Sequence, residues 1–322
     1  MSSKAPVPDD GAASFAALRA HLTRVAYRML GSAAEAEDVV QDAYLRWHRT
    51  ERAAVDDPRA FLTRIVTRLC LDVFKSARMQ RETYIGPWLP EPVFDTANFV
   101  GASNFGMRDF GASEASESFR LRDDDITLTL MLALERLSPL ERAAFLLHDI
   151  FGMSFDEVAQ SVQRDAAACR QLATRARKHV RDARPRFPVT PKRGQDIAAA
   201  FFEASRSGDM VGLRAVLADD VVAYADGGGK IAAAHKPIYG RDKVARMFVG
   251  LARKQGYQPL PLLAHGSIDG LPGFLTGDPT EMLQTTTLEI DATGVRAIYI
   301  TRNPDKLRWM ADFGMRQAHG AG

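Results

Sequence analysis

The sequence predicts a multidomain protein in which two all-α domains precede an α+β domain. Apolar residues recur at helical spacing through residues 14–80. Residues 138–181 have the capping signals of three short helices, and apolar runs separated by turns begin after residue 194. A chain of 322 residues also exceeds the size of one small helical bundle. We therefore expect domains at 1–81, 126–187 and 194–322, with a linker at 82–125.

The first domain is predicted to contain three helices. Phe15, Leu22 and Met29 belong to one apolar stripe that forms the first helix. A second helix is expected from about residue 32 to 49, with apolar residues on its inner side. Its outer face is polar and consists of Asp38, Gln41, Asp42 and Arg46. A solvated surface is the ordinary role of mixed charges on a helix, and it stays open here beside a binding role.

The third predicted helix starts at Pro58 and combines an apolar side with a basic ridge. Phe61, Leu62 and Leu69 belong to the apolar side. The ridge consists of Arg59, Arg64, Arg68, Lys75, Arg78 and Arg81. Positive charge in a row suits a nucleic-acid backbone, although any one of these residues could equally be ordinary surface charge.

Residues 138–181 are typical of a helix-turn-helix. Ser138 and Ser154 each open a capping box, and Asp165 can cap a third, basic helix. Residues 164–193 contain ten Lys or Arg and two acids. Such a field neutralises phosphates, and donors at the front of the third helix can read base edges. A solvated basic helix on an ordinary bundle is the alternative. The DNA-facing candidates are Arg170, Gln171, Arg175, Arg177 and Lys178.

Composition limits the remaining classes of function. The formal net charge is only +2, so the basic excess is local and other faces are left for protein partners. Cys70 and Cys169 lie far apart without a CxxC or Cys/His neighbourhood. We therefore expect no disulfide, no metal and no cofactor, as in a reducing cytoplasm. No apolar run approaches the length of a membrane span, and the first residues do not have the pattern of a signal peptide.

The linker contains the sequence GPWLPEP at residues 86–92. Three prolines stiffen this backbone, and Trp88 and Leu89 offer an apolar anchor. We expect the segment to dock on another surface. A rigid spacer with an incidentally packed tryptophan is the alternative.

The third domain is predicted to place helices before strands, which makes it α+β. Helices are expected at 195–207 and 241–254, and a shorter helix is expected to start at Gly208-Asp209 and to bury Leu213, Val216 and Leu217. Strands are expected at 221–225, 282–290 and 295–301. A glycine turn at 226–230 follows the first strand, and residues 303–307 are expected to turn into a last strand or an extended end.

The order EDVVQDAYLRW, PRAFLTRIVTRLCLD and a basic helix-turn-helix resembles the bacterial extracytoplasmic-function (ECF) sigma factors. The resemblance implies that the helix of residues 38–47 binds core RNA polymerase and that the helix of residues 58–81 captures and melts the minus-ten element. It also implies that residues 165–181 read the minus-thirty-five element. Phe61 and Arg68 stand where many relatives have Trp and Asn. Strand opening needs a basic surface and planes for unstacked bases, and this ridge fits that need.

The third domain resembles the SnoaL-like branch of the cone-shaped fold shared with nuclear transport factor two. Its DGGGK and NPDKL motifs, with WLPEP in the linker, match a group of ECF sigma factors that carry a fused SnoaL-like extension. The group implies intramolecular contact between the extension and the sigma domains, with control in cis. We hypothesise that the three motifs meet at one interface whose charge pairs can break; turns that merely close strands are the alternative. The candidate regulatory contacts are Trp88, Leu89, Pro90, Glu91, Asp226, Gly228, Lys230, Asn303, Asp305 and Lys306.

The resulting prediction is a cytoplasmic sigma factor that binds core RNA polymerase and promoter DNA and is tuned by its own C-terminal domain. A helix-turn-helix regulator with a ligand-sensing SnoaL-like domain is the alternative, and a small molecule is a possible partner in either case. SnoaL-like relatives also include cyclases and isomerases, and Tyr224, Asp226 and His235 could mimic their proton-transfer groups. No second His or Asp completes a dyad at evident spacing. We therefore expect no enzyme.

Overall fold

The structure is a computed structural model that describes residues 11–82, 84–94, 128–183, 189–254, 258–278 and 282–308. The chain divides into two compact units. The described part of the first unit comprises residues 11–79 and 133–182. The described part of the second comprises the end of one helix at residues 80–82, the linker residues 84–94, residues 128–132 and the chain from 183 onward. Each unit is described separately.

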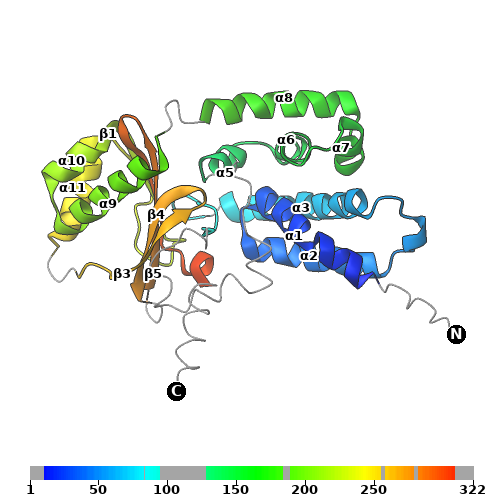
Figure 1. Ribbon diagram of the computed structural model, residues 1–322, viewed down its shortest axis with the longest axis horizontal. Coiled ribbons are helices and arrows are strands. Elements are labelled where there is room, and N and C mark those ends of the chain that lie inside the picture. The colour runs from blue at the N-terminus through cyan, green and yellow to red at the C-terminus, as the bar shows by residue number, and fades with distance from the viewer. Residues whose placement is uncertain are drawn as a thin grey trace, which may run out of the picture. The chain divides into compact units, whose positions relative to one another are not determined.

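The N-terminal half of the first unit consists of helices, as predicted (Figure 1). Gly31 ends the first helix in the left-handed conformation, and Ser32 caps the second by accepting from the Glu35 amide. Trp47 is buried, and its Nε1 donates to the Gly11 carbonyl at 2.9 Å. These contacts fix the direction in which the outer face of the second helix points. The elements are α1 (Ala12–Leu30), α2 (Ala33–His48), the 3-10 turn η1 (Arg52–Ala54) and α3 (Pro58–Glu82).

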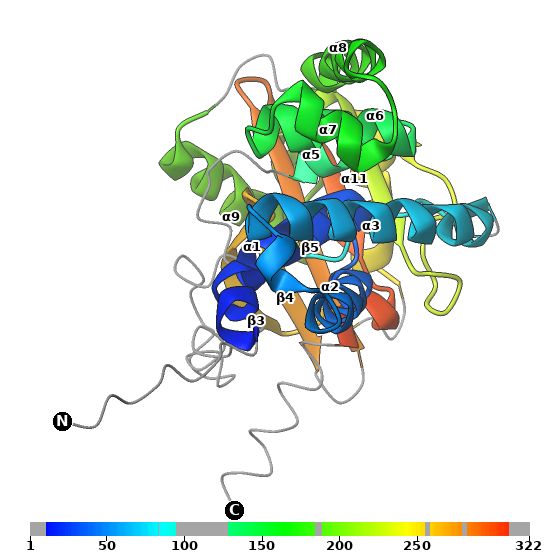
Figure 2. The same ribbon diagram turned by 90° about the vertical axis from the view of Figure 1, so that its right-hand side faces the viewer.

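The other half of the first unit contains the predicted helix-turn-helix. Both predicted capping boxes are confirmed, with Ser138 paired to Glu141 and Ser154 paired to Glu157. Gln163 ends the second of these helices at φ 56°, which turns the chain into the long basic helix. Figure 1 shows this basic helix from the side, and Figure 2 shows it nearly end-on. The elements are α5 (Leu128–Glu135), which passes from the second unit into the first, α6 (Pro139–Phe145), the π-helical turn η5 (Leu146–Ile150), α7 (Phe155–Val162) and α8 (Ala166–Ala183).

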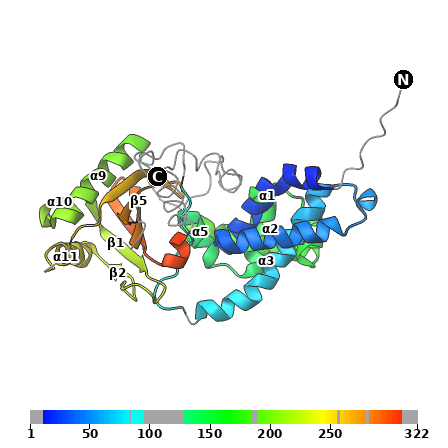
Figure 3. The ribbon, with the colours of Figure 1, turned by 90° about the horizontal axis from the view of Figure 1, so that it is seen from below.

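The second unit is α+β, as predicted, and is built on one six-stranded sheet in the order β2-β1-β6-β5-β4-β3. Strands β1 and β6 pair in parallel, and the other neighbours are antiparallel. Three helices lie on one side of the sheet (Figures 1 and 3), where Phe201, Val244 and Ile298 share one core. The elements are α9 (Pro191–Ser207), α10 (Met210–Val216), β1 (Leu217–Asp226), β2 (Ile238–Tyr239), α11 (Arg241–Ala252), β3 (Leu262–Ile268), β4 (Leu271–Asp278), β5 (Met282–Asp291) and β6 (Gly294–Thr301).

The second unit differs from the sequence prediction at the short strand β2, which was not expected, at the hairpin of β3 and β4, and at residues 303–307. The hairpin of β3 and β4 was not anticipated; Asp269 and Gly270 form its turn, both at positive φ. Residues 303–307 were expected to turn into a last strand or an extended end, but residues 304–308 are helical, and any strand after residue 308 lies outside the described residues. The Asn303 side chain accepts from the Asp305 amide, and Pro304 follows as the first helical residue. The asparagine is therefore a helix cap.

Candidate functional site

The polar face predicted for the second helix lies on α2 and faces solvent. Asp38, Gln41, Asp42 and Arg46 are all exposed, because Val39, Ala43 and Trp47 occupy the buried side of the same helix. Leu45 lies on this face and keeps 48% of its surface exposed. Sequence reasoning missed Leu45. The only signal in the sequence was an apolar residue among the polar positions of this helix face. This face of α2 therefore combines charged side chains with one exposed apolar side chain. It consists of Asp38, Gln41, Asp42, Leu45 and Arg46.

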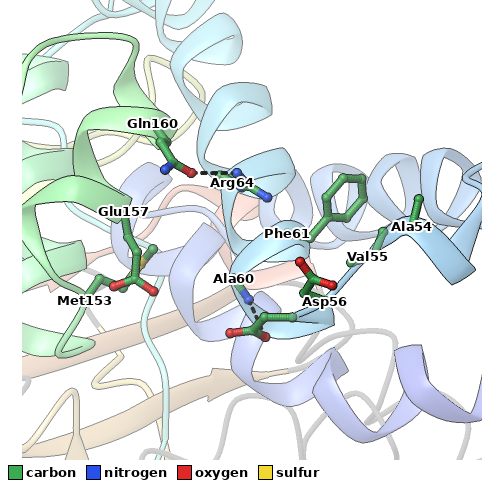
Figure 4. Close-up of a pocket in the computed structure, with 10 residues that line it drawn as sticks. Ala54, Val55, Asp56, Ala60, Phe61, Arg64, Met153, Glu157 and Gln160 are labelled. Atoms are coloured by element: carbon green, nitrogen blue, oxygen red, sulfur yellow. Dashed lines mark hydrogen bonds between the residues drawn. The ribbon is translucent and has the colours of Figure 1, made fainter.

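The basic ridge of α3 is partly engaged by α7 within the first unit. Arg64 Nη1 donates to Gln160 Oε1 at 2.8 Å, and Arg68 Nη2 donates to the Gln160 carbonyl at 2.9 Å. Figure 4 shows Arg64 reaching across to Gln160 beside a cavity of about 330 Å³. Arg59 is exposed. The side chains of Lys75 and Arg78 lie outside the described residues, as does that of Arg81.

A buried arginine joins α6 to the N-terminal helices of the first unit. Arg142 is 1% exposed; its Nε donates to the Leu134 carbonyl at 2.9 Å and its Nη1 to the Met29 carbonyl at 2.6 Å. The same guanidinium lies 2.7 Å from Glu135 and stacks over Phe74. Sequence reasoning missed this residue, since one arginine in an apolar run does not reveal which carbonyls it will reach.

The basic residues predicted on the third helix of the helix-turn-helix lie on α8 and are all exposed. Leu172, Ala173 and Ala176 take its buried side. Two of these arginines form ion pairs with acidic residues of the preceding helices. Arg175 pairs with Glu141 at 3.1 Å, and Arg177 pairs with Asp149 at 2.7 Å. A row of accessible donors therefore follows one side of α8. The predicted members are Arg170, Gln171, Arg175, Arg177 and Lys178.

In the second unit, the linker and the two predicted turns meet at the carboxylate of Asp226, which has no exposed surface. This carboxylate accepts from the Leu89 amide at 2.9 Å, from the Gly228 amide at 3.0 Å and from the Tyr84 hydroxyl. Burial, followed by the hydrogen bond to Asp226, raises the pKa of Tyr84, so the phenol stays protonated and donates. We call this cluster, with Asn303 and Lys306, the linker clamp.

Lys306 supplies the positive charge of the linker clamp. Its Nζ lies 2.7 Å from Asp226 Oδ2 and also donates to the Leu89 carbonyl. The ammonium lies 4.2 Å from the ring centre of Trp88 and 5.0 Å from that of Tyr84. Pro90 and Glu91 are buried as well. The WLPEP segment is thus fixed by charge, ring and backbone contacts at once.

The two turns of the clamp also contact each other. The amides of Arg302 and Asn303 donate to the Asp226 carbonyl at 2.7 and 3.0 Å. Asn303 Nδ2 donates to the Tyr84 hydroxyl at 2.9 Å. Gly228 has φ 61°, and a Cβ placed on it would lie 2.4 Å from Asn303 Nδ2. Glycine is therefore needed here for both backbone conformation and space. At the solvent side, Lys230 pairs with Asp305 at 2.7 Å.

Asp269 forms a second anchor for the linker, and sequence reasoning missed it. Its carboxylate accepts from the Val93 amide at 3.1 Å, and its own amide donates to the Val93 carbonyl at 2.7 Å. Its carbonyl accepts from the Leu128 amide at 2.8 Å. One residue thus holds both the end of the described linker segment and the start of α5. The Asp-Gly pair between apolar runs was the available signal, because it marks a hairpin turn.

The linker covers the face of the sheet opposite α9 and α11. Side chains alternate along β6: Ile298 enters the helical core, whereas Ala297 and Tyr299 pack with Leu89 and Leu128 on the other face. Further along the linker, Phe94 bridges Ile268 and joins a third apolar cluster. The linker therefore closes a face that would otherwise leave these apolar side chains in water.

The residues considered for proton transfer do not share a pocket. Asp226 is committed to the linker clamp, Tyr224 stacks on Tyr299 at 5.4 Å, and His235 is exposed. Among the described residues, no group of three or more His, Cys, Asp or Glu side chains is placed to hold a metal. None of the described helices is long and apolar enough to cross a membrane.

Two basic helices in one helical unit, one of them in a helix-turn-helix, are typical of a DNA-binding protein. Residues 15–79 match the family model of sigma-70 region 2, and residues 127–180 match that of sigma-70 region 4. The first match accounts for an N-terminal domain that a helix-turn-helix repressor would not need. The alternative of a conventional regulator is therefore not favoured.

Two ECF sigma factors are similar to this protein over nearly the whole chain. The chain is 37% identical to the ECF RNA polymerase sigma factor SigJ of Mycobacterium tuberculosis over 91% of each protein. It is 31% identical to the probable ECF sigma factor SigI of that organism, over 93% of this chain and 95% of SigI. The crystal structure of M. tuberculosis SigJ superposes with a TM-score of 0.68 at 34% identity, covering 92% of this chain and 98% of that one. The chain belongs to the ECF RNA polymerase sigma factors and directs the initiation of transcription.

Proposed function

We propose that three surfaces of the first unit carry out initiation. The exposed α2 face with Leu45 at its centre binds core RNA polymerase, since it combines charge with an apolar contact. The α3 ridge holds the opened minus-ten region, and the exposed donors of α8 read the minus-thirty-five element in the major groove. Because core RNA polymerase works there, the cytoplasm is the place of action.

We infer that the C-terminal domain controls these surfaces in cis by holding the linker between them. The observation that carries this proposal is the double anchorage: Asp226 holds Leu89 near one end of the linker, and Asp269 holds Val93 and Leu128. Chain connectivity makes α3 and α5 the continuations of the held segments. Docking therefore limits how far the two helical domains can separate.

The hydrogen bonds between the α3 arginines and α7 are the contacts on which control by the linker would act. Arg64 and Arg68 both donate to Gln160, and these contacts hold the two guanidinium groups toward α7 and compete with an opened DNA strand for them. We propose that promoter opening requires α3 and α7 to part. The linker then acts on a two-state element, because its release or retention changes the free energy of that separation.

Run-off transcription with core polymerase and a library of candidate promoters tests the proposal on the full chain. Trp88→Ala removes a linker contact while leaving the sheet and its turns unchanged. We expect specific transcripts from the parent chain and a yield that changes at least severalfold in the variant. Tyr239→Phe, at an exposed position away from the clamp, is the matched control.

Two results would count against the proposal in different ways. If the parent chain gives no transcript on any template, the assignment of surfaces fails. If it transcribes and Trp88→Ala matches it on every promoter, while amide hydrogen exchange shows that residues 84–94 have been released, control through the linker fails.

The α2 face has its own test. Asp42→Arg reverses a charge at an exposed position, so the fold is kept while the proposed contact is opposed. We expect co-elution with core polymerase in gel filtration to be lost or greatly weakened. Glu37→Arg makes the same charge change on α2 beside that face and should co-elute as the parent does. Equal binding by both variants would assign the polymerase contact elsewhere.

A further inference from the structure

The second unit contains a partly open cavity of about 800 Å³ between its helices and its sheet. Phe201, Phe202, Phe248 and Phe274 line it, with Ile300 at the sheet side. This volume lies within the usual range for sites that hold small organic ligands. The lining is mostly apolar, so the cavity suits a molecule with an extended apolar body.

The described residues that line the cavity carry charges of one sign. Among the described lining residues, Arg206, Lys254 and Arg302 are cationic and none carries a carboxylate. Arg206 donates to the Leu260 carbonyl and lies over the Phe202 ring, and it forms no ion pair with any carboxylate in the described part of the chain. A guanidinium has five N–H donors, and apolar walls strengthen its attraction for an anion. The cavity therefore favours one anionic group on an apolar ligand.

The same cavity shares a wall with the linker. Ala225 and Ala232–Ala234 line both the large cavity and a second cavity of about 220 Å³, which is also lined by Ile85 and Gly86 of the linker. Arg302 reinforces the link, since its Nη1 donates to the Ala232 carbonyl at 2.6 Å while its amide donates to the Asp226 carbonyl at 2.7 Å. A ligand in the large cavity thus touches the backbone that borders the docked linker.

We propose that this cavity is an effector site for an apolar monocarboxylic acid, with Arg206 binding the carboxylate, and that occupancy changes the hold on residues 84–94. The coupling rests on the proposed control through the linker. Binding energy that differs between the docked and released linker shifts that equilibrium, and linker docking changes ligand affinity by the same factor.

Calorimetric titration of the full chain tests the binding step with decanoate as the probe and decanol as its uncharged counterpart. We expect saturable binding of decanoate, weakened about tenfold or more in Arg206→Met, as for loss of a hydrogen bond to a charged group. Arg206→Lys should recover part of the affinity. Arg214→Met removes an arginine from α10 that does not line the cavity and should bind as the parent does. Failure to bind decanoate, or equal binding of both probes by parent and Arg206→Met, would overturn the site.

Amide hydrogen exchange of residues 84–94 with and without saturating decanoate tests the coupling. We expect protection of this segment to change severalfold in the parent chain, and unchanged protection at saturation would overturn the coupling. Neither readout requires transcription. Failure of linker control in the run-off assay is therefore distinguishable from failure of the binding site.

Discussion

Two lysine–aspartate pairs join the same two turns of the second unit, and they differ in their surroundings. Asp226–Lys306 and Lys230–Asp305 both have an N···O distance of 2.7 Å. The side chains of the first pair are 0% and 8% exposed, whereas those of the second are 54% and 51% exposed. Distance alone would rank them equally. Burial makes the first expensive to break, while water and salt screen the second.

The buried pair also has more partners, and these include the linker. Asp226 accepts from Tyr84 and Leu89, and Lys306 contacts Trp88. The exposed pair joins turn to turn only, as far as its described contacts show. We therefore expect the buried pair to decide whether the linker stays docked.

The largest effect is expected from Lys306→Ala. It leaves the Asp226 carboxylate buried without its cation, which should cost about 3–5 kcal/mol of the free energy of unfolding of the second unit. Urea denaturation followed by circular dichroism measures this, and exchange at residues 84–94 reports on the linker. The double variant Asp226→Asn/Lys306→Met removes both charges and should recover most of the loss. A single variant as stable as the parent would contradict the assigned role of the pair.

Tyr84→Phe separates linker docking from the stability of the sheet. The change removes one hydroxyl, which donates to Asp226 and accepts from Asn303. A hydrogen bond to a charged group contributes about 1.5–3 kcal/mol, and Tyr84 is half-buried, so we expect the lower part of that range. Exchange of residues 84–94 should quicken accordingly while the unfolding midpoint of the sheet changes little. Tyr239→Phe, on the exposed side of β2, should leave both unchanged.

Gly228→Ala tests the close approach of the two turns. The residue has φ 61°, and an added Cβ would lie 2.4 Å from Asn303 Nδ2. The backbone cost is about 1–3 kcal/mol, and Asn303 must also move from Tyr84. We expect partial linker release in the exchange experiment. Gly250→Ala is a matched control in α11, where an added Cβ meets nothing within 4 Å and the helix should be stabilised slightly. Equal exchange in both variants would show that the turns tolerate the extra carbon.

Prediction from sequence succeeded where the signal was local. Ser138 and Ser154 form the capping boxes expected of them, and α8 presents its basic residues to solvent. The choice of Asp226 and Lys306 rested on the motif resemblance and not on a local signal, and the two residues lie together in one cluster. Asp269 and Arg142 were not found, because their partners are carbonyls and amides of distant segments. Almost every residue has the same backbone N–H and carbonyl groups, so the sequence does not indicate which of them a side chain will contact. Only the fold does.

Lys230→Ala is expected to have the smallest effect. It is the direct test of whether burial makes the Asp226–Lys306 pair stronger than the Lys230–Asp305 pair. It breaks an ion pair at the same distance as the buried one, in the same two turns, but with both side chains about half exposed. The loss should be about 0–1 kcal/mol and should diminish further at high salt, since exposed pairs are screened. Urea denaturation and exchange at residues 84–94, each at low and high salt, measure this. A loss as large as that of Lys306→Ala would mean that position in the turns, rather than burial, sets the strength of the clamp.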